Sequence, residues 1–322
     1  MIRHVALVGP TAAGKSDLAL GLARSDPRFE IVSLDSMQVY RGMDIGTAKP
    51  TPAERAEVAH HLVDVVDPRD EWSVARTQSD ARAALADIEG RGGRALLVGG
   101  TGLYVHAVID AFTLPGEDRA VRADLEAQTA EPDGLDAAWR ALYTADPVAA
   151  ARIDPGNRRR IVRALEVIAV TGRPFSSFGP GVLASAGTRL PSTGAGSVSS
   201  ISSRVRMLGL WQTREQSAEA IERRIGAMRA GGLVEEVESL RARPWARSAR
   251  QAIGYKEIDA ALASGASARG LDTAFELVGR RTRRFARRQR MWFRRDQRVT
   301  WIHASNPDDR AQIAQEIVAE PS

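Results

Sequence analysis

The segment "GPTAAGKS", Gly9 to Ser16, has the residue types and the spacing of a loop that binds phosphate. It follows the apolar run "HVALVG" and fits the pattern G-x-x-x-x-G-K-[ST] at each fixed position. In such a loop, backbone N–H groups and a helix N-terminus attract an anion. Lys15 would reach the terminal phosphates, and the Ser16 hydroxyl would contact Mg²⁺. A strand before and a helix after the segment favour this interpretation over a chance glycine-rich turn.

Two more polar segments follow apolar runs. Asp35 closes the run "FEIVSLDS". In phosphate-loop kinases an acid near this place takes a proton from the attacking group, although an aspartate can also simply cap a turn. The segment "GGTGLY" at 99–104 offers the Thr101 hydroxyl, and a plain turn explains it equally well. The third strand carries no acid of the Walker B kind, which argues against a motor-type ATPase.

Arginine is concentrated in the segment "RRTRRFARRQRMWFRR", which begins at residue 280. Ten arginines lie between 280 and 298, against the single acid Asp296. Phe285 and Trp292 are seven residues apart, so they share one face of a helix. A helix that carries charge of one sign and an aromatic seam suits contact with nucleic-acid phosphates better than a solvated face. For a second cluster, Arg158, Arg159, Arg160 and Arg163, both interpretations stay open.

The composition is that of an ordinary globular protein with a basic balance. The 322 residues carry a net charge of +5, and the only lysines among 45 basic residues are Lys15, Lys49 and Lys256. A chain that prefers arginine so strongly would keep a lysine where a compact ammonium is needed. The alternative is that these three lysines were retained by chance. There is no cysteine, which excludes disulfides and thiolate zinc sites. Without a signal peptide or a membrane span, we expect a cytoplasmic protein.

The pattern of elements predicts an α/β fold with a parallel sheet. The runs "HVALVG", "FEIVSLDS" and "RALLVGGTG" are typical of buried strands, and helical patterns lie at 15–25 and 73–92. Strands that alternate with helices form a doubly wound sheet, and ligands bind beyond the carboxyl ends of its strands. The segments 9–16, 35–49 and 99–104 should therefore converge on one cleft.

The pattern changes after about residue 113. Residues 118–171 read as helices without an intervening strand, and 179–203 are rich in Gly, Ser, Ala and Pro, as in a flexible loop. The run "RVRMLGLWQ" returns as a strand, and long helices follow, the last of them rich in arginine. We therefore predict a catalytic core at 1–113 and 204–322 and a helical insertion domain at 114–203, which ends in the Gly/Ser-rich loop.

A set of motifs in this order resembles one family. They are "GPTAAGKS", "DSMQVYRGMDIGTAKP", "HHLVDVVDP", "LVGGTGLY", "NRRRIVRALEV", "QAIGYKE" and "RRFARRQRMWFRR". Together they look like the tRNA dimethylallyltransferases, also called tRNA isopentenyltransferases, over roughly residues 3 to 301. The resemblance implies a P-loop NTPase-like core, and transfer of a dimethylallyl group from its diphosphate to the exocyclic amine of the adenosine 3′ to the anticodon of tRNA.

The resemblance also implies roles for particular residues. The loop would hold the prenyl diphosphate through Gly9, Pro10, Thr11, Ala12, Ala13, Gly14, Lys15 and Ser16, with Mg²⁺ on Ser16. Asp35 would act as the general base, and Thr101 and Arg214 would stabilise the departing pyrophosphate or fix the reacting groups. The implied contacts with the anticodon stem-loop of tRNA are Asp35, Ser36, Met37, Gln38, Arg122, Arg159, Arg160, Ile161, Val162, Arg163, Gln251, Gly254, Tyr255 and Lys256.

The chain departs from the family pattern in a few places. Arg159 stands where the family commonly has glutamine, and the loop at 181–203 is longer and richer in Gly and Ser. The absence of cysteine excludes the zinc finger of eukaryotic members, so the resemblance is to the bacterial form, expected to work as a monomer without a protein partner. The alternatives are a nucleoside or small-molecule kinase, a prenyltransferase that acts on free adenylate, and an RNA-binding protein without catalysis.

Overall fold

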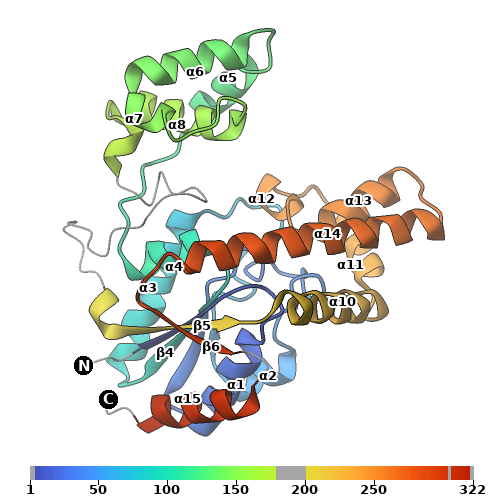
Figure 1. Cartoon of the computed structure of the whole chain (residues 1–322). Coiled ribbons are helices and arrows are strands. Elements are labelled where there is room, and N and C mark those ends of the chain that lie inside the picture. The colour runs from blue at the N-terminus through green and yellow to red at the C-terminus, as the bar shows by residue number, and fades with distance from the viewer. Residues whose placement is uncertain (1–3, 179–200, 304–305, 320–322) are drawn as a thin grey trace. The chain divides into compact units, whose positions relative to one another are not determined.

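The structure is a computed structural model that describes residues 4–178, 201–303 and 306–319 (Figure 1). The chain forms two compact units, the first from residues 1–109 and 200–322 and the second from residues 110–199. The boundaries predicted from the sequence, 113/114 and 203/204, lie slightly further along the chain. Most of the predicted Gly/Ser-rich loop, residues 179–200, lies outside the described residues.

A parallel sheet of six strands forms the centre of the first unit. Its strands are β1 (His4–Val8), β2 (Phe29–Ser33), β3 (His60–His61), β4 (Arg94–Gly99), β5 (Val205–Trp211) and β6 (Val299–His303). Their order in the sheet is β3-β2-β4-β1-β5-β6, and every neighbouring pair is parallel. All residues of β1 and β4 are buried, as expected where helices cover both faces of a parallel sheet. The predicted α/β fold with a parallel sheet is confirmed.

Helices cover the two faces of this sheet and its carboxyl edge. The helices of the first unit are α1 (Lys15–Ser25), α2 (Pro52–Glu57), α3 (Val74–Gly90), α4 (Gly102–Ile109), α10 (Arg214–Ala230), α11 (Leu233–Arg241), α12 (Arg247–Arg250), α13 (Tyr255–Ala263), α14 (Ala268–Phe293) and α15 (Pro307–Ala319). Successive residues of β1 point to opposite faces. Val5 and Leu7 pack with α1 and α15, whereas Ala6 and Val8 pack with α3 and α4.

A second apolar cluster of the first unit joins α10, α11, α13 and α14 to the segment that follows β2. Tyr40 and Met43 of that segment are fully buried against Ile221, Val237 and Phe275 of the helices. The long helix α14 contacts α10 and α13 as well as α4. The segment that carries Asp35 therefore rests on helices that lie about two hundred residues later in the chain.

The prediction that the chain ends with helices was incomplete. Strand β6 follows α14 and pairs with β5, with Leu208 opposite Thr300 and Leu210 opposite Ile302. The run "VTWIH" alternates only in part, and its position directly after an arginine-rich helix concealed its strand character. Among the described residues, no helix is long and apolar enough to cross a membrane.

The second unit is helical. It contains α5 (Arg119–Gln128), α6 (Gly134–Ala145), α7 (Pro147–Ala150) and α8 (Arg158–Thr171), followed by the 3-10 turn η1 (Phe175–Phe178). Side chains of Asp118, Asp146 and Asn157 cap the N-termini of three of these helices. Leu142 and Ile161 are fully buried in a core of the unit's own.

Candidate functional site

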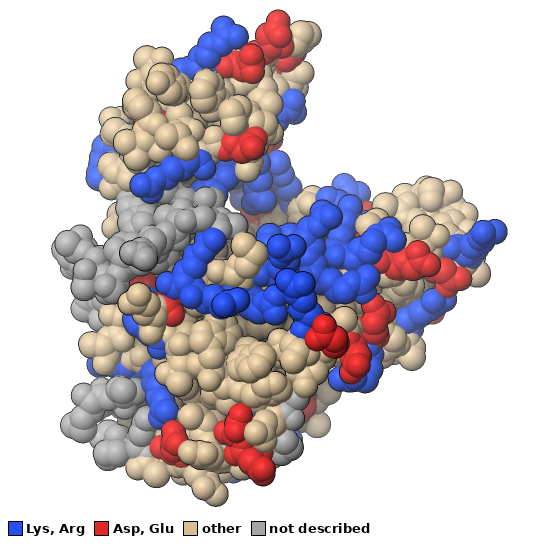
Figure 2. Space-filling view, viewed as in Figure 1, with Lys and Arg blue, Asp and Glu red and all other residues tan. Residues whose placement is uncertain are grey.

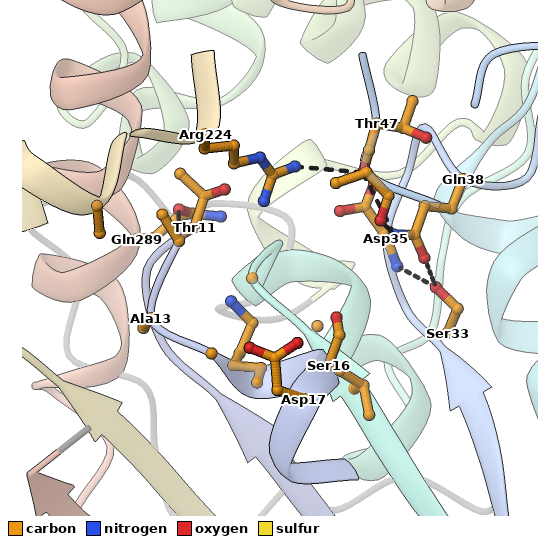
Figure 3. Close-up of a pocket in the computed structure, with 18 of the residues that line it drawn as sticks. Thr11, Ala13, Ser16, Asp17, Ser33, Asp35, Gln38, Thr47, Arg224 and Gln289 are labelled. Carbon is orange, nitrogen blue, oxygen red and sulfur yellow. Dashed lines mark hydrogen bonds between the residues drawn. The ribbon is translucent and has the colours of Figure 1, made fainter. Parts of the chain in front are cut away.

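A cavity of about 440 Å³ lies at the carboxyl edge of the sheet, beyond β1, β2 and β4. The residues that line it come from all three segments predicted to converge and from α10, α14 and α15. They are Thr11 to Asp17, Ser33, Asp35, Gln38, Thr47, Ala48, Val98, Gly99, Gly100, Gln212, Ala220, Arg223, Arg224, Phe285, Gln289 and Arg310. Figure 3 shows Thr11, Ser16, Asp35 and Arg224 around this one space.

The backbone of the phosphate loop depends on its glycines. Gly9 has φ +130°, and a Cβ atom there would lie 2.5 Å from the carbonyl oxygen of Leu210. Gly14, which precedes the first residue of α1, has φ +80°. Both conformations strain any residue with a side chain. Thr11 to Ser16 line the cavity, whereas Gly9 and Pro10 do not.

Lys15 is held inside the loop. Its ammonium donates a hydrogen bond to the carbonyl oxygen of Pro10 at 2.7 Å. Burial and the positive charge of Arg224 lower the pKa of Lys15 to about 8, against the opposing effect of Asp35. An anion in the cavity would supply the missing counter-charge and raise this pKa again.

Asp35 follows β2 and faces the cavity (Figure 3). One of its carboxylate oxygens accepts the backbone N–H of Met37 at 2.8 Å, which fixes the side chain in a local turn. Gln38 accepts the Ser33 hydroxyl hydrogen at 2.9 Å and donates to the carbonyl oxygens of Thr47 and Ala48. Asp35 is thus a carboxylate held within reach of the cavity, as general-base catalysis requires.

Arg224 is a cavity residue that the sequence analysis missed. Its guanidinium donates to the carbonyl oxygen of Thr47 at 3.2 Å, and burial lowers its pKa against the effects of Asp35 and Asp17. A signal was available, because Arg224 stands between Ile221 and Ile225 on the buried side of α10. A charged residue on a buried face needs a partner.

Gln289 is a second missed residue. It is buried within the arginine-rich helix, and its carboxamide oxygen accepts the backbone N–H of Thr11 at 2.8 Å. A Cβ atom on Gly100 would collide with its side-chain nitrogen at 2.2 Å. Gln289 therefore joins α14 to the phosphate loop, and Gly100 makes room for it.

A turn at residues 44–48, which we call the Thr47 turn, supplies the carbonyl groups that hold Arg224 and Gln38. Oε2 of Glu236 accepts the backbone N–H groups of Asp44 and Ile45 at 3.0 and 2.9 Å. Its Oε1 accepts the N–H of Gly46 at 3.3 Å and the Tyr255 hydroxyl at 2.5 Å. One carboxylate therefore fixes the turn.

Lys49, directly after the Thr47 turn, connects the turn to neighbouring residues. Its side chain is 2% exposed, and its ammonium donates to the Tyr40 carbonyl oxygen at 2.7 Å and to the carboxylates of Asp44 and Asp64. Lys256, by contrast, is exposed and donates to Gln251 at 2.8 Å. Of the three lysines, Lys15 and Lys49 therefore hold their ammonium groups in hydrogen bonds to backbone carbonyl oxygens, a role that a compact ammonium suits.

Gly254 and Tyr255, two of the predicted tRNA contacts, are buried. Tyr255 is fully buried, and its ring packs where a Cβ atom of Gly46 would lie. Burial and the Glu236 carboxylate raise the pKa of Tyr255, so its hydroxyl stays a donor. Gly254 has φ +101° at the start of α13. Tyr255 supports the Thr47 turn through Glu236 and Gly46, whereas Gln251 and Lys256 are exposed.

Thr101 and Arg214 do not line the cavity. Thr101 precedes α4, and its carbonyl oxygen accepts the N–H groups of Tyr104 and Val105; the neighbouring Gly100 lines the cavity instead. Arg214 is exposed at the first turn of α10 and lines a separate groove. Arg224, ten positions later on the same helix, lines the cavity.

Several predicted tRNA contacts of the second unit serve its own structure. Glu166 is fully buried and accepts hydrogen bonds from the N–H of Asp118 and from the guanidinium of Arg122. Arg163 forms an ion pair with the same carboxylate at 3.0 Å. Burial opposes ionisation of Glu166, but these bonds outweigh it and lower its pKa.

The remaining predicted tRNA contacts on α8 differ in their exposure to solvent. Ile161 and Val162, which were predicted to contact tRNA, are buried. Arg159 is exposed and Arg160 half-buried. After β2, Ser36 is half-buried, and Met37 is partly buried against the apolar cluster of α10 and α14.

Arginines of α14 gather on the molecular face shown in Figure 2. Phe285 lines the cavity, whereas Trp292 packs over Gly102 beside the core. The buried Gln289 lies between these two aromatic residues in the sequence and on the same face of α14. Arg281 and Arg283 pair with Glu257 and Glu222.

A phosphate loop at the carboxyl edge of a parallel sheet, facing a fixed aspartate and a half-buried arginine, defines a phosphate-loop enzyme that acts on a phosphorylated substrate. The family model described as IPP transferase matches residues 38–296, and a model described as isopentenyl transferase matches residues 2–64. The chain belongs to the IPP transferase family.

Relatives with this architecture span nearly the whole chain. A tRNA dimethylallyltransferase of Kineococcus radiotolerans is 47% identical over 98% of this chain and 95% of its own length, and one of Geobacter metallireducens is 46% identical over 93% and 92%. The crystal structure of a full-length tRNA isopentenylpyrophosphate transferase from Bacillus halodurans is 38% identical, with a TM-score of 0.67 over 99% of this chain and 96% of that one. The fold and the family predicted from the sequence are confirmed.

Proposed function

We propose that this protein transfers a dimethylallyl group from dimethylallyl diphosphate to the exocyclic amine of the adenosine 3′-adjacent to the anticodon in tRNA. The observation that carries the proposal is that the phosphate loop and Asp35 line one cavity in a chain of the IPP transferase family. Relatives at 46–47% identity over nearly full length are named tRNA dimethylallyltransferase.

The cavity suits a reaction in which the diphosphate is the leaving group, rather than one in which a nucleophile attacks a phosphate. The allylic C–O bond breaks and the electron pair stays on the diphosphate, so negative charge grows on its oxygens. The phosphate loop, Lys15 and the half-buried Arg224 line this cavity, where their N–H and cationic groups would stabilise the growing negative charge. A new C–N bond forms at the adenine amine, and Asp35 accepts the proton that this amine loses.

The residues present fit a divalent metal, as generally expected of a prenyltransferase that uses a diphosphate, and we propose that it is Mg²⁺. The Ser16 hydroxyl and the Asp17 carboxylate line the cavity beside the phosphate loop. No cluster of three or more His, Cys, Asp or Glu able to hold a metal occurs among the residues the structure describes. This suits Mg²⁺, which binds through one or two protein oxygens, water and substrate phosphates. When bound, the ion would neutralise charge on the diphosphate.

The acceptor base must reach the cavity from within an RNA chain. We propose that the adenosine leaves its stack, as in other enzymes that modify bases, and enters beside Asp35 and Gln38. Exposed basic groups of both units, including Arg159 and the arginines of α14, would hold the RNA backbone. The second unit would then be an RNA-binding insertion. A tRNA substrate also agrees with the expected cytoplasmic location.

Asp35→Asn tests this assignment. The amide keeps the shape of the side chain but takes up no proton, so we expect transfer to fall at least about a hundredfold, the lower end of what general bases contribute. Binding of unmodified tRNA should stay within about twofold. Asp70→Asn, at an exposed position outside the cavity, is the matched control and should keep parental transfer. Parental transfer by Asp35→Asn would remove Asp35 from the mechanism.

A further inference from the structure

The C-terminal helix α15 lies beside α1, the helix that follows the phosphate loop (Figure 1). Strand β6 runs parallel to β5 and ends at the carboxyl edge of the sheet, so α15 starts at the edge where the phosphate loop lies. Ile313 and Ile317 of α15 are buried in the apolar cluster that contains Leu18 and Leu22 of α1. These contacts hold α15 against the helix whose first residues line the cavity.

Arg310 of α15 lines the reaction cavity. It precedes Ile313 by three positions and Ile317 by seven, so it shares the helix face that packs on α1. Its two terminal guanidinium nitrogens lie 3.7 and 3.8 Å from the position that a Cβ atom on Gly14 would occupy. The guanidinium group therefore lies beside the last glycine of the phosphate loop, directly before Lys15.

The charge of Arg310 is not balanced by a partner within the described part of the chain. Helix α15 forms an ion pair through Glu316, which contacts Arg206 of β5, but Arg310 has neither an ion pair nor a side-chain hydrogen bond to a described residue. The Oδ2 atom of Asp17 lies 3.7 Å from the same Cβ position on Gly14 without forming an ion pair with Arg310. Because Arg310 is half-buried, water screens its charge less than that of a surface arginine.

Arg310 and Arg224 approach different parts of the cavity. The guanidinium group of Arg224 extends toward Thr47 on the side where Asp35 lies (Figure 3), whereas Arg310 adjoins Gly14. In the proposed function, Asp35 takes the proton of the attacking amine. The prenyl carbon and the phosphate that carries it must then lie nearer Asp35 than the terminal phosphate does. The terminal phosphate is therefore the one within reach of Arg310.

We propose that Arg310 binds the terminal phosphate of dimethylallyl diphosphate, so that the C-terminal helix contributes one of the cations of the diphosphate site. A guanidinium group donates paired N–H bonds to the oxygens of one phosphate, and both terminal nitrogens of Arg310 lie near the loop. Arg310 lies beyond residues 38–296, the segment that the family model matches, so its role follows from the packing of α15 and not from a family motif. The inference rests on the proposed function for the identity of the diphosphate.

Calorimetry with inorganic pyrophosphate and Mg²⁺ tests this contact without any chemistry. Arg310→Gln should bind pyrophosphate about tenfold or more weakly than the parent, because paired charge-assisted hydrogen bonds are lost. Arg310→Lys keeps the charge but not the paired donors, so its affinity should lie between the two. Arg243→Gln is the matched control, since Arg243 is exposed outside the cavity, and it should keep parental affinity. Parental affinity in Arg310→Gln would overturn the proposal.

Denaturant unfolding separates binding from folding. Because Arg310 forms no ion pair with a described residue, Arg310→Gln should unfold at the same midpoint as the parent. A lower midpoint together with unchanged pyrophosphate affinity would show that Arg310 supports the docking of α15 instead, and the proposal would be wrong.

Steady-state transfer identifies the phosphate that Arg310 contacts. Charge grows mainly on the oxygens next to the breaking C–O bond, whereas the terminal phosphate is bound before and during the reaction. Arg310→Gln should therefore raise the KM for dimethylallyl diphosphate about tenfold and change kcat by less than about threefold. A large fall in kcat at parental KM would place Arg310 at the departing oxygen and contradict the assignment to the terminal phosphate.

Two further outcomes separate this inference from its alternatives. If Arg310→Gln keeps parental pyrophosphate affinity but binds unmodified tRNA more weakly, Arg310 contacts RNA and the proposal is wrong. Because pyrophosphate binding is measured without chemistry, binding that depends on Arg310 in a protein that transfers no prenyl group would refute the proposed function alone. Transfer by the parent, together with parental pyrophosphate affinity in Arg310→Gln, would refute this inference alone.

Discussion

Replacing Glu236 by glutamine should loosen the Thr47 turn that orients Arg224 and Gln38. Each oxygen of this carboxylate accepts two hydrogen bonds. Glutamine keeps one acceptor oxygen, so its amide nitrogen must face two of the four donors. The less costly arrangement turns the amide nitrogen toward the Tyr255 hydroxyl and the Gly46 N–H. The Tyr255 hydroxyl can rotate to accept a hydrogen bond, and the Gly46 contact is already long at 3.3 Å.

The expected loss of stability follows from these changes in the hydrogen bonds of residue 236. The Gly46 amide loses its acceptor, and the amides of Asp44 and Ile45 exchange a charged acceptor for a neutral one. A net hydrogen bond contributes about 1 kcal/mol, and one to a charged group somewhat more. Since the turn is partly exposed to water, we expect the free energy of unfolding to fall by about 2 kcal/mol. The kcat/KM of transfer should fall about tenfold, because a loss of about 1.4 kcal/mol at the cavity gives that factor.

The assay pairs denaturant unfolding with steady-state transfer, measured well below the unfolding midpoint of every variant. Glu238→Gln is the control, since Glu238 is exposed on the same helix and the change in charge is identical. Glu236→Ala should cost more than Glu236→Gln. A Glu236→Gln protein with parental stability and parental kcat/KM would refute the reasoning, as would an equal loss in the control.

Further predictions concern the same cavity. Because the free ammonium of Lys15 loses its proton above a pKa of about 8, affinity for dimethylallyl diphosphate should fall about tenfold per pH unit above that value; calorimetry that finds equal affinity at pH 7 and pH 9.5 would contradict this. Gly46→Ala places a Cβ atom 2.4 Å from the ring of Tyr255, so the midpoint of unfolding should fall with a cost of about 1–3 kcal/mol. Gln289→Leu removes the acceptor of the Thr11 amide and should raise the KM for dimethylallyl diphosphate several-fold while leaving the KM for tRNA unchanged; an unchanged KM for the diphosphate would remove Gln289 from the support of the loop.

The sequence predicts well those features that local patterns encode. Strand β1, the phosphate loop and α1 follow from one apolar run, two glycines and a helical stripe, and Asp35 follows from the end of the second run. These elements are close together in the sequence, so the spacing of their residues is enough to predict their structure. The convergence of three strand ends follows from the rule for parallel sheets.

The sequence does not predict partners that are far apart along the chain. Glu236 meets the amides of residues 44–46 from about 190 positions away, and Gln289 meets Thr11 across an even longer interval. Both look like ordinary surface residues of charged helices. Tyr255 and Gly254 belong to a recognisable motif, but only the packing shows that the motif supports a turn. The placement of Arg224 rather than Arg214 at the cavity depends on the face that α10 buries, and apolar positions at Ile221 and Ile225 mark that face.

The most direct test of the central claim is incubation of the purified protein with labelled dimethylallyl diphosphate, Mg²⁺ and unmodified tRNA, followed by nucleoside analysis of the digested RNA. The account predicts label on the exocyclic amine of the adenosine 3′-adjacent to the anticodon, one pyrophosphate released for each group transferred, and no product when ATP replaces dimethylallyl diphosphate. Phosphate transfer from ATP to a nucleoside, with no label in the RNA, would contradict it.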